Sequence, residues 1–201
     1  YPTLAQLLEK CVEMLDNPEG FFIMIEGGRI DWSAHANDTA TTVREIIALD
    51  GALGVALDFM KKRPEETLVI AVGDHETGGL STGAAGVTST SDFSILTNQT
   101  ISTREFDEKM RQAVLKNPKI NFEDAKKMIT KGFGFKFDGD PKKDPMVLKE
   151  KETAKLKEDF ETDLAKLLSN IIKKKDAVEY LTKSKHRLSV RLSRLISKRA
   201  G

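Results

Sequence analysis

The stretch FFIMIEGGRIDWSAH, residues 21–35, joins an apolar run directly to a charged segment. The residues before Glu26 are uniformly apolar, and such an uninterrupted run is typical of a strand buried on both faces in a parallel sheet. The segment that follows holds two carboxylates and a histidine, because Asp31 and His35 come soon after Glu26. The stretch therefore predicts a buried strand that ends at candidate metal ligands or proton carriers.

A second apolar run, TLVIAVG at residues 67–73, predicts another buried strand. Between the two runs, apolar residues recur at spacings of three and four up to Pro64, which is the pattern of a helix. A strand, a helix and a strand in this order favour a crossover with two parallel strands, whose carboxyl ends lie along one edge of the sheet. The sequence therefore predicts an α/β fold with its site at that edge.

Polar side chains follow both predicted strands. Asp74 and His75 come directly after the second strand, while Asp31 and His35 are four residues apart and would meet on one helical turn. Together with Glu26 they make five candidate metal ligands at one sheet edge. Carboxylate oxygens and imidazoles suit Zn²⁺, and an oxygen position around Glu26 suits Mg²⁺. Two zinc ions, one held by each Asp and His pair, would fit phosphoryl transfer best.

Capping signals predict further helices. Thr3 with Gln6 forms a capping box, Ser102 with Glu105 starts a helix through about residue 115, and Asn121 starts a short one. These signals are local, so they predict where helices begin without reference to the rest of the chain.

The later part of the chain reads as mainly helical. Residues 93–102 predict another strand, and Asp144 before Pro145 predicts a helix start. Apolar residues at helical spacing then run from Leu156 to Ile172, and a last helix is expected over residues 176–198. We expect an α/β core portion at 1–82, a mainly helical insertion at 83–175, and a helix returning to the core at 176–201.

Composition excludes little. The 32 Lys and Arg residues balance 31 Asp and Glu residues, so the net charge of +1 gives no argument for nucleic acid or acidic substrates. The single cysteine, Cys11, excludes an internal disulfide. No apolar run approaches the roughly 20 residues that span a bilayer. Because Tyr1 rather than Met comes first, we expect a piece of a longer protein.

The segments EGGRIDWSAHAND and TLVIAVGDHETGGL resemble the two metal-binding motifs of the alkaline phosphatase family. The resemblance implies part of an α/β three-layer sandwich with parallel strands, plus the helical insertion. It implies that Glu26 binds Mg²⁺. It also implies a water-activating zinc and a second zinc next to the nucleophile, which are held respectively by Asp31 with His35 and by Asp74 with His75. Trp32 stands where several relatives carry His or Lys, a position that tunes the metal site, although it could also cap the core.

The same resemblance implies parts that are not recognised in this sequence. The family's serine nucleophile with its neighbouring aspartate and a phosphate-binding arginine are expected before the first motif, and a third zinc-binding histidine after the last residue. His186 does not replace that histidine. We therefore expect the chain alone to be nearly inactive. For the intact enzyme the resemblance implies small phosphate monoesters as substrates, a homodimer, and a periplasmic or secreted location, without nucleic acid or membrane partners.

Two other functions stay open. One is a different activity of the same superfamily, as a phosphodiesterase, phosphomutase or sulfatase, against which Glu26 argues because its metal site is typical of monoesterases. The other is a non-catalytic scaffold in which the helical insertion is the working part. The tail at 183–199 has no acidic residue and could touch a membrane or nucleic acid, but its apolar stripe favours packing against the rest of the chain. The Gly-rich and Ser/Thr-rich segments at 81–92 favour loops.

Overall fold

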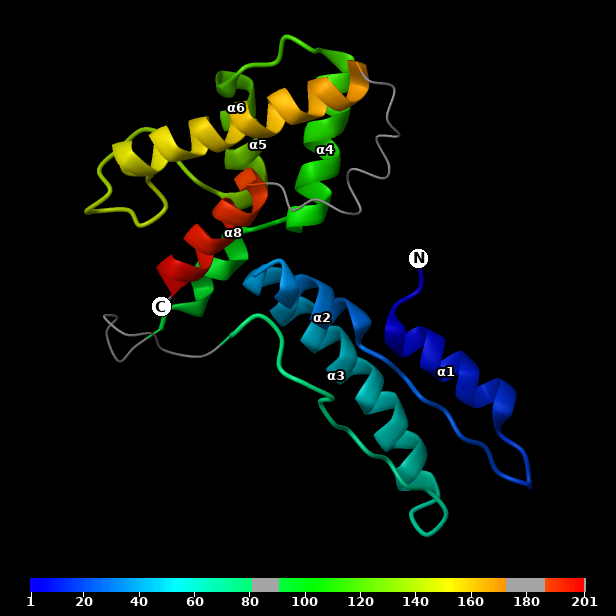
Figure 1. The fold of residues 1–201 in the computed structure, drawn as a ribbon. Helices are drawn as coiled ribbons and strands as arrows, with labels where there is room; N and C mark the ends of the chain where they lie inside the picture. The colour runs from blue at the N-terminus through cyan, green and yellow to red at the C-terminus, as the bar shows by residue number, and fades with distance from the viewer. Residues whose placement is uncertain (81–90, 173–186, 201) are drawn as a thin grey trace. The chain divides into compact units, whose positions relative to one another are not determined.

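The computed structural model describes residues 1–80, 91–172 and 187–200, and these form two compact units. The first unit comprises Tyr1–His35 and Thr41–Gly79, and the second comprises Ala36–Ala40 and Leu80–Gly201. Every regular element of the described residues is helical (Figure 1). The predicted division at residues 82 and 175 stays a prediction, and the loops predicted at 81–90 lie outside the described residues.

The first unit contains α1 (Leu4–Leu15), α2 (Gly28–His35) and most of α3 (Thr39–Lys62). The predicted capping box of α1 is confirmed: the Gln6 N–H donates to Thr3 Oγ1 at 3.2 Å, and the Thr3 N–H donates to Gln6 Oε1 at 2.9 Å. The bidentate contact of Arg63 with Asp16 then links the end of α3 to the end of α1, at 2.6 and 2.8 Å. The helix predicted up to Pro64 is thus present as α3.

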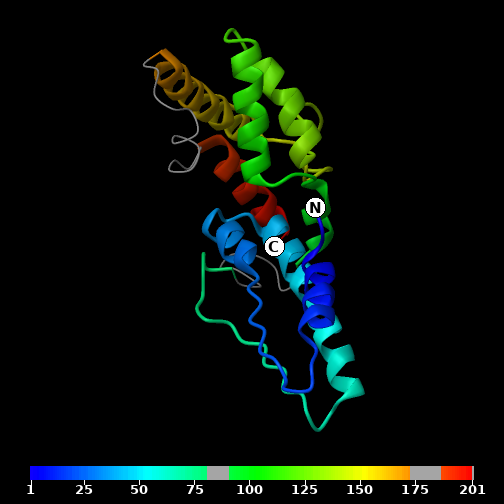
Figure 2. The same ribbon diagram turned by 90° about the vertical axis from the view of Figure 1, so that its right-hand side faces the viewer.

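The predicted α/β three-layer sandwich with parallel strands is wrong for this structure, because the described residues contain no strand. Residues 21–26 and 67–73 are extended traces (Figure 2), but neither shares a backbone hydrogen bond with another described segment. A strand exists only when a second segment pairs with it, and apolar composition alone supplies no partner. The outer face of both segments is correspondingly open, with exposures of 74–87% for Phe22, Met24, Leu68, Ile70 and Val72.

The inner face of the first extended segment packs locally instead. The rings of Phe21 and Phe59 lie 5.6 Å apart, so the segment covers part of α3. Its residues alternate between half-buried and exposed, as Phe21 and Phe22 illustrate. The run is therefore covered on one face only, and the prediction of a strand buried on both faces is wrong here.

The predicted strand at 93–102 and the predicted helix start at Asp144 are also wrong, because an Asp side chain at each place bonds a nearby backbone N–H. The strand expected at 93–102 is a 3₁₀-helix, η1 (Phe93–Asn98), because the Asp92 carboxylate accepts the Ser94 N–H at 3.0 Å and starts a helical turn. The helix start expected at Asp144 is a turn, in which Asp144 accepts the Met146 N–H at 2.8 Å. The next helix begins only at Glu150.

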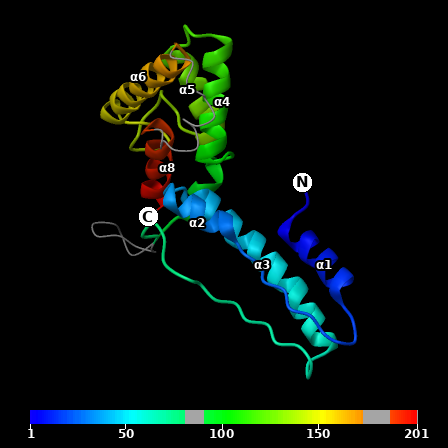
Figure 3. The ribbon, with the colours of Figure 1, turned by 45° about the vertical axis from the view of Figure 1, so that its right-hand side comes forward.

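In the described part of the second unit, four α-helices lie together (Figures 1 and 3) around one apolar core: α4 (Thr103–Lys116), α5 (Phe122–Phe133), α6 (Glu150–Ile172) and α8 (Arg187–Ala200). The predicted starts are confirmed, because Ser102 and Asn121 accept backbone N–H groups of α4 and α5. The apolar stripe predicted for α6 is confirmed from Leu156 to Leu168, and its last part, Ile171 and Ile172, lies outside the described side chains. Its buried members are Leu156, Phe160 and Leu167.

Helix α8 lies against α4, α5, α6 and η1. Its Leu192 and Ile196 are fully buried, so the apolar stripe of the tail packs on the other helices as expected. Two arginines fix the helix further: Arg191 pairs with the buried carboxylate of Asp159, and Arg199 bonds Glu152 at 2.8 Å. The expected start of this helix at 176–186 lies outside the described residues. No helix among those described combines the length and apolarity needed to cross a bilayer.

Asp38 connects the short segment Ala36–Ala40 to the helical unit. Its side chain is buried, with one oxygen accepting the Gln99 Nε2–H at 2.7 Å and the other accepting the Thr103 N–H at 2.8 Å. Thr103 is the first residue of α4, so the carboxylate also lies at the positive end of that helix.

Replacing Asp38 by Ala should destabilise the helical unit, because two buried donors would lose their acceptor. We expect the free energy of unfolding to fall by about 3 kcal/mol in urea titrations followed by circular dichroism. The control is Asp138→Ala, which removes an exposed carboxylate of the same unit and should change stability by less than about 0.5 kcal/mol. Equal stability of the two variants would contradict this role.

Candidate metal-binding site

Helix α2 brings the first pair of predicted ligands together. Asp31 lies in its first turn and His35 in its last, with Asp31 Oδ1 and His35 Nε2 3.5 Å apart. The helix is anchored by Ser33, whose hydroxyl donates to the Arg29 carbonyl at 2.9 Å and accepts from Thr42 on α3 at 2.9 Å. An acidic residue near the start and a histidine near the end both suit the helix dipole.

The second pair lies in the segment that follows residue 73. Asp74 Oδ1 accepts the His75 N–H at 3.0 Å, and Asp74 Oδ2 lies 3.3 Å from His75 Nε2. Gly78 and Gly79 then turn the chain with φ of +83° and +69°, which glycine adopts without strain. The turn brings the Gly79 N–H to the carboxylate of Glu76, which accepts it at 2.5 Å.

Thr77 joins the two pairs. Its hydroxyl donates to Asp31 Oδ1 at 2.8 Å, and its oxygen lies 3.0 Å from His75 Nδ1. The carboxylate from α2 and the imidazole from the later segment therefore share one hydroxyl, although they come from distant parts of the sequence. Thr77 thus contacts one member of each pair, with His35 beside Asp31 and Asp74 beside His75, and it does so without the sheet edge that the sequence predicted.

The pairs differ in solvent access. The side chain of Asp31 is 36% exposed, whereas those of His35, Asp74 and His75 are 63%, 87% and 58% exposed. Glu26 is exposed and its carboxylate folds back over Gly28, where an added Cβ would meet Oε1 at 3.3 Å. Trp32 is 64% exposed, so it does not cap a core in this structure.

The donor chemistry fits zinc, but each pair is only part of a site. Two donor atoms at 2.0–2.2 Å from one tetrahedral zinc ion lie roughly 3.4 Å apart, which is the spacing seen within both pairs. Among the described residues, however, no three His, Cys, Asp or Glu side chains are close enough to hold one ion. Each pair would thus supply two of about four ligands, and the rest must come from other groups or from water.

Comparison with known proteins decides the family. The alkaline phosphatase family model matches residues 1–169, which is most of the chain. The chain belongs to the alkaline phosphatase family. The resemblance to this family is therefore confirmed. Phosphate monoester hydrolysis is the general reaction of the family, whose members are generally metal-dependent.

Several curated alkaline phosphatases are similar over part of the chain. Alkaline phosphatase 4 of Bacillus subtilis is 43% identical over 86 residues, covering 42% of this chain and 18% of the relative. The repressible alkaline phosphatase of Saccharomyces cerevisiae is 42% identical over 89 residues, covering 41% and 16%. Alkaline phosphatase H of Pseudomonas aeruginosa is 47% identical over 75 residues, covering 37% and 16%. The match thus spans less than a fifth of these alkaline phosphatases. No solved structure matches the chain significantly.

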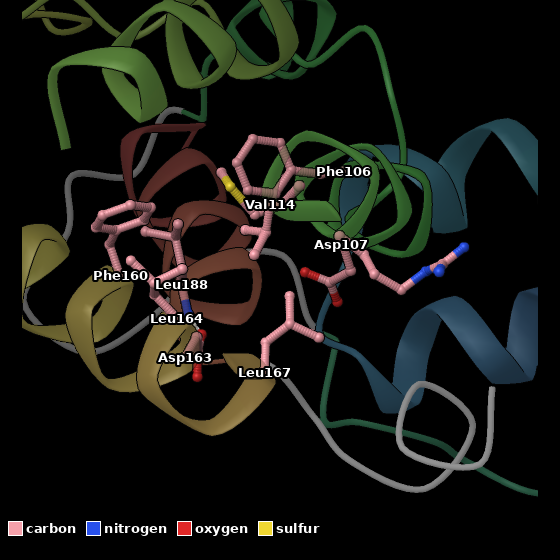
Figure 4. Close-up of a pocket in the computed structure, with 10 residues that line it drawn as sticks. Phe106, Asp107, Val114, Phe160, Asp163, Leu164, Leu167 and Leu188 are labelled. Carbon is pink, nitrogen blue, oxygen red and sulfur yellow. Dashed lines mark hydrogen bonds between the residues drawn. The ribbon is translucent and has the colours of Figure 1, made fainter. Parts of the chain in front are cut away.

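Two acidic side chains line a small cavity of the helical unit. Asp107 on α4 and Asp163 on α6 line a cavity of about 20 Å³, with apolar neighbours such as Phe160 and Leu188 (Figure 4). That volume holds about one water molecule. Asp163 accepts the Leu188 N–H at 2.9 Å, which ties the start of α8 to α6. Both carboxyl groups are half-buried where α4, α6 and α8 meet.

Asp107 and Asp163 were not predicted from the sequence. The available signal was their helical register, because Asp107 lies beside Phe106 and three residues before Met110 on the packed side of α4. Burial raises the pKa of Asp107 to about 8, the Ser189 hydroxyl opposes the rise by hydrogen bonding, and the charge of Asp163 adds to it. At neutral pH the Asp107 carboxyl is accordingly protonated in the folded chain.

This raised pKa makes the stability of the helical unit depend on pH. Between about pH 4 and pH 8 the folded state holds a proton on Asp107 that the unfolded state has lost, so stability falls as pH rises through this range. We expect a loss on the order of 2 kcal/mol, less than the full conversion of the shift because the carboxyl is only partly shielded from water.

Asp107→Asn should remove this dependence. The amide stays neutral at every pH. The unfolding free energy of the variant should therefore rise relative to that of the wild type as the pH increases from 5 to 8.5, measured in urea titrations at several pH values. Asp138→Asn, at an exposed position of the same unit, is the control and should follow the wild type. Parallel pH profiles for the wild type and Asp107→Asn would contradict the buried proton.

Proposed function

We propose that the intact protein is an alkaline phosphatase that hydrolyses small phosphate monoesters, with Asp31, His35, Asp74 and His75 as zinc ligands. The observation that carries the proposal is the shared hydroxyl of Thr77, which holds a carboxylate of the first motif and an imidazole of the second in one site. Membership of the family supports the reaction class. The spacing of about 3.4 Å within each donor pair supports the metal.

In this proposal each pair of side chains holds one zinc ion. Asp31 and His35 bind the zinc that activates water, while Asp74 and His75 bind the zinc beside the nucleophile. Glu26 binds Mg²⁺, in keeping with its carboxylate oxygens and exposed position. When bound, such ions neutralise charge on the phosphoryl group and lower the pKa of a coordinated water. The protein's part is to hold the donor atoms at fixed spacing and open to solvent.

The proposal extends to the surroundings of this site. A serine that is not among these 201 residues accepts the phosphoryl group, and Trp32 lies beside the metal ligands on α2, where it adjusts phosphate binding. The intact enzyme is a homodimer in the periplasm or outside the cell, and it acts on small molecules rather than on nucleic acids or membranes. These points rest on the family resemblance alone.

The proposal predicts that the motif residues are needed for turnover. In the full-length protein with Zn²⁺ and Mg²⁺, Asp31→Asn and His75→Gln should each lower kcat/KM for p-nitrophenyl phosphate by about 100-fold or more, because each removes a ligand of an essential ion. Asp50→Asn is the matched control, since this carboxylate of α3 is exposed and lies outside both motifs.

Turnover and zinc content of the full-length protein separate the alternatives. Turnover of bis(p-nitrophenyl) phosphate well above that of the monoester would favour a phosphodiesterase. Full activity of both ligand variants would contradict the assigned site. Absence of zinc from the purified full-length protein after dialysis against Zn²⁺ would favour a scaffold.

A further inference from the structure

The hydrogen bonds of Thr77 determine where its single proton goes. A threonine hydroxyl has one proton to donate and two lone pairs that accept. The Asp31 carboxylate can only accept, and it lies 2.8 Å from Thr77 Oγ1, so the hydroxyl proton points to Asp31 Oδ1. The oxygen of Thr77 therefore faces His75 Nδ1, 3.0 Å away, with a lone pair.

A second acceptor faces the same nitrogen. The carbonyl oxygen of Glu76 lies 3.2 Å from His75 Nδ1, and a carbonyl has no proton to give. Both neighbours of Nδ1 are thus acceptors, and both contacts are satisfied only when Nδ1 carries a proton. In a neutral imidazole that proton leaves Nε2 with its lone pair free.

A carboxylate oxygen lies close to Nε2. Asp74 Oδ2 lies 3.3 Å from it, so two electron-rich atoms approach each other closely. A cation held by both atoms turns this approach from unfavourable to favourable. The position of Thr77 therefore matters for the chemistry of a pair to which it does not itself belong.

We infer that Thr77 is a positioning residue: its hydroxyl holds His75 as the Nδ1–H tautomer and orients Asp31, so that His75 Nε2 is left to bind a cation. The identity of the cation rests on the proposed function, whereas the tautomer does not. A hydroxyl in this place acts on both donor pairs at once, because it donates one hydrogen bond to the first motif and accepts one from the second. Such supporting hydrogen bonds typically change metal affinity by 10- to 100-fold.

The tautomer is measurable in the 201-residue chain without metal. The chain has three histidines, so two-bond ¹H–¹⁵N correlation spectra contain three imidazole patterns, and a His75→Gln variant assigns that of His75. The spectra are recorded at about pH 8.5. We expect the Nδ1–H pattern for His75 in the wild type and in Thr77→Ser, with a clear shift toward Nε2–H in Thr77→Val.

The control is Thr97→Val, which removes an exposed hydroxyl that bonds only the Ser94 carbonyl of its own turn, at 2.6 Å. It should leave the His75 pattern unchanged. Circular dichroism of each variant checks that the helices persist. A wild-type chain with His75 as Nε2–H, or a Thr77→Val variant that keeps the Nδ1–H pattern in full, would overturn the inference.

Metal affinity gives a second readout that separates this inference from the proposed function. In the full-length protein, Thr77→Val should weaken Zn²⁺ binding at least about tenfold in competition with a chromophoric chelator, while Thr77→Ser stays within about threefold of the wild type. An unchanged affinity of Thr77→Val would overturn the positioning role. A wild-type protein that binds no zinc, but has His75 in the expected tautomer, would instead overturn the proposed function and support the hydrogen-bonding part of the inference.

Discussion

The candidate site depends on a single hydroxyl shared between two segments 46 residues apart. Thr77 donates a hydrogen bond to Asp31 and presents a lone pair to His75, so its hydroxyl fixes one atom of each motif. A hydrogen bond of this kind contributes only about 1 kcal/mol to stability, but its directionality sets which atoms face the solvent. The donor pairs would each remain local contacts within their own segment without this connection.

Each of the two units is stabilised by a different amount of buried apolar surface. The helical unit has an aromatic and aliphatic core, in which Phe106, Phe133 and Phe135 are almost completely buried, and α8 closes that core through Leu192 and Ile196. The buried apolar side chains described in the first unit are Leu8, Ala34 and Ala52, which are few and mostly small. Because burial of apolar area is the main source of stability, the helical unit carries more of it. The candidate site lies in the less buried unit, where solvent reaches the ligands.

The starts of the helices were predictable from local signals. The two strands at 21–26 and 67–73 were predicted wrongly, because a strand also needs a partner segment. The hydroxyl of Thr3 with the amide of Gln6, or Ser102 at the start of α4, satisfies helix ends within four residues, so the sequence alone reveals them. Residues 21–26 and 67–73 need partner segments to become strands, and no such partner is present among the described residues. An apolar run of this kind indicates that a segment favours an extended backbone, but it does not supply the second strand.

The site was predictable in its residue types but not in its connections. Asp31 and His35 at helical spacing, and Asp74 beside His75, identified the family, and that identification is confirmed. Thr77 was overlooked, because a threonine beside two glycines is ordinary in a turn and its role appears only with its neighbours in space. Asp107 was overlooked for a related reason: its pKa depends on burial between helices that the sequence does not position.

A double-mutant cycle on Asp31 and His75 tests most directly whether the two motifs form one site. The measured quantity is kcat/KM for p-nitrophenyl phosphate in the full-length protein, for Asp31→Asn, His75→Gln and both together. If the two residues serve one site joined through Thr77, the loss in the double variant should be close to the larger single loss and well below the product of the two. Losses that multiply fully would show two independent residues and contradict a shared site.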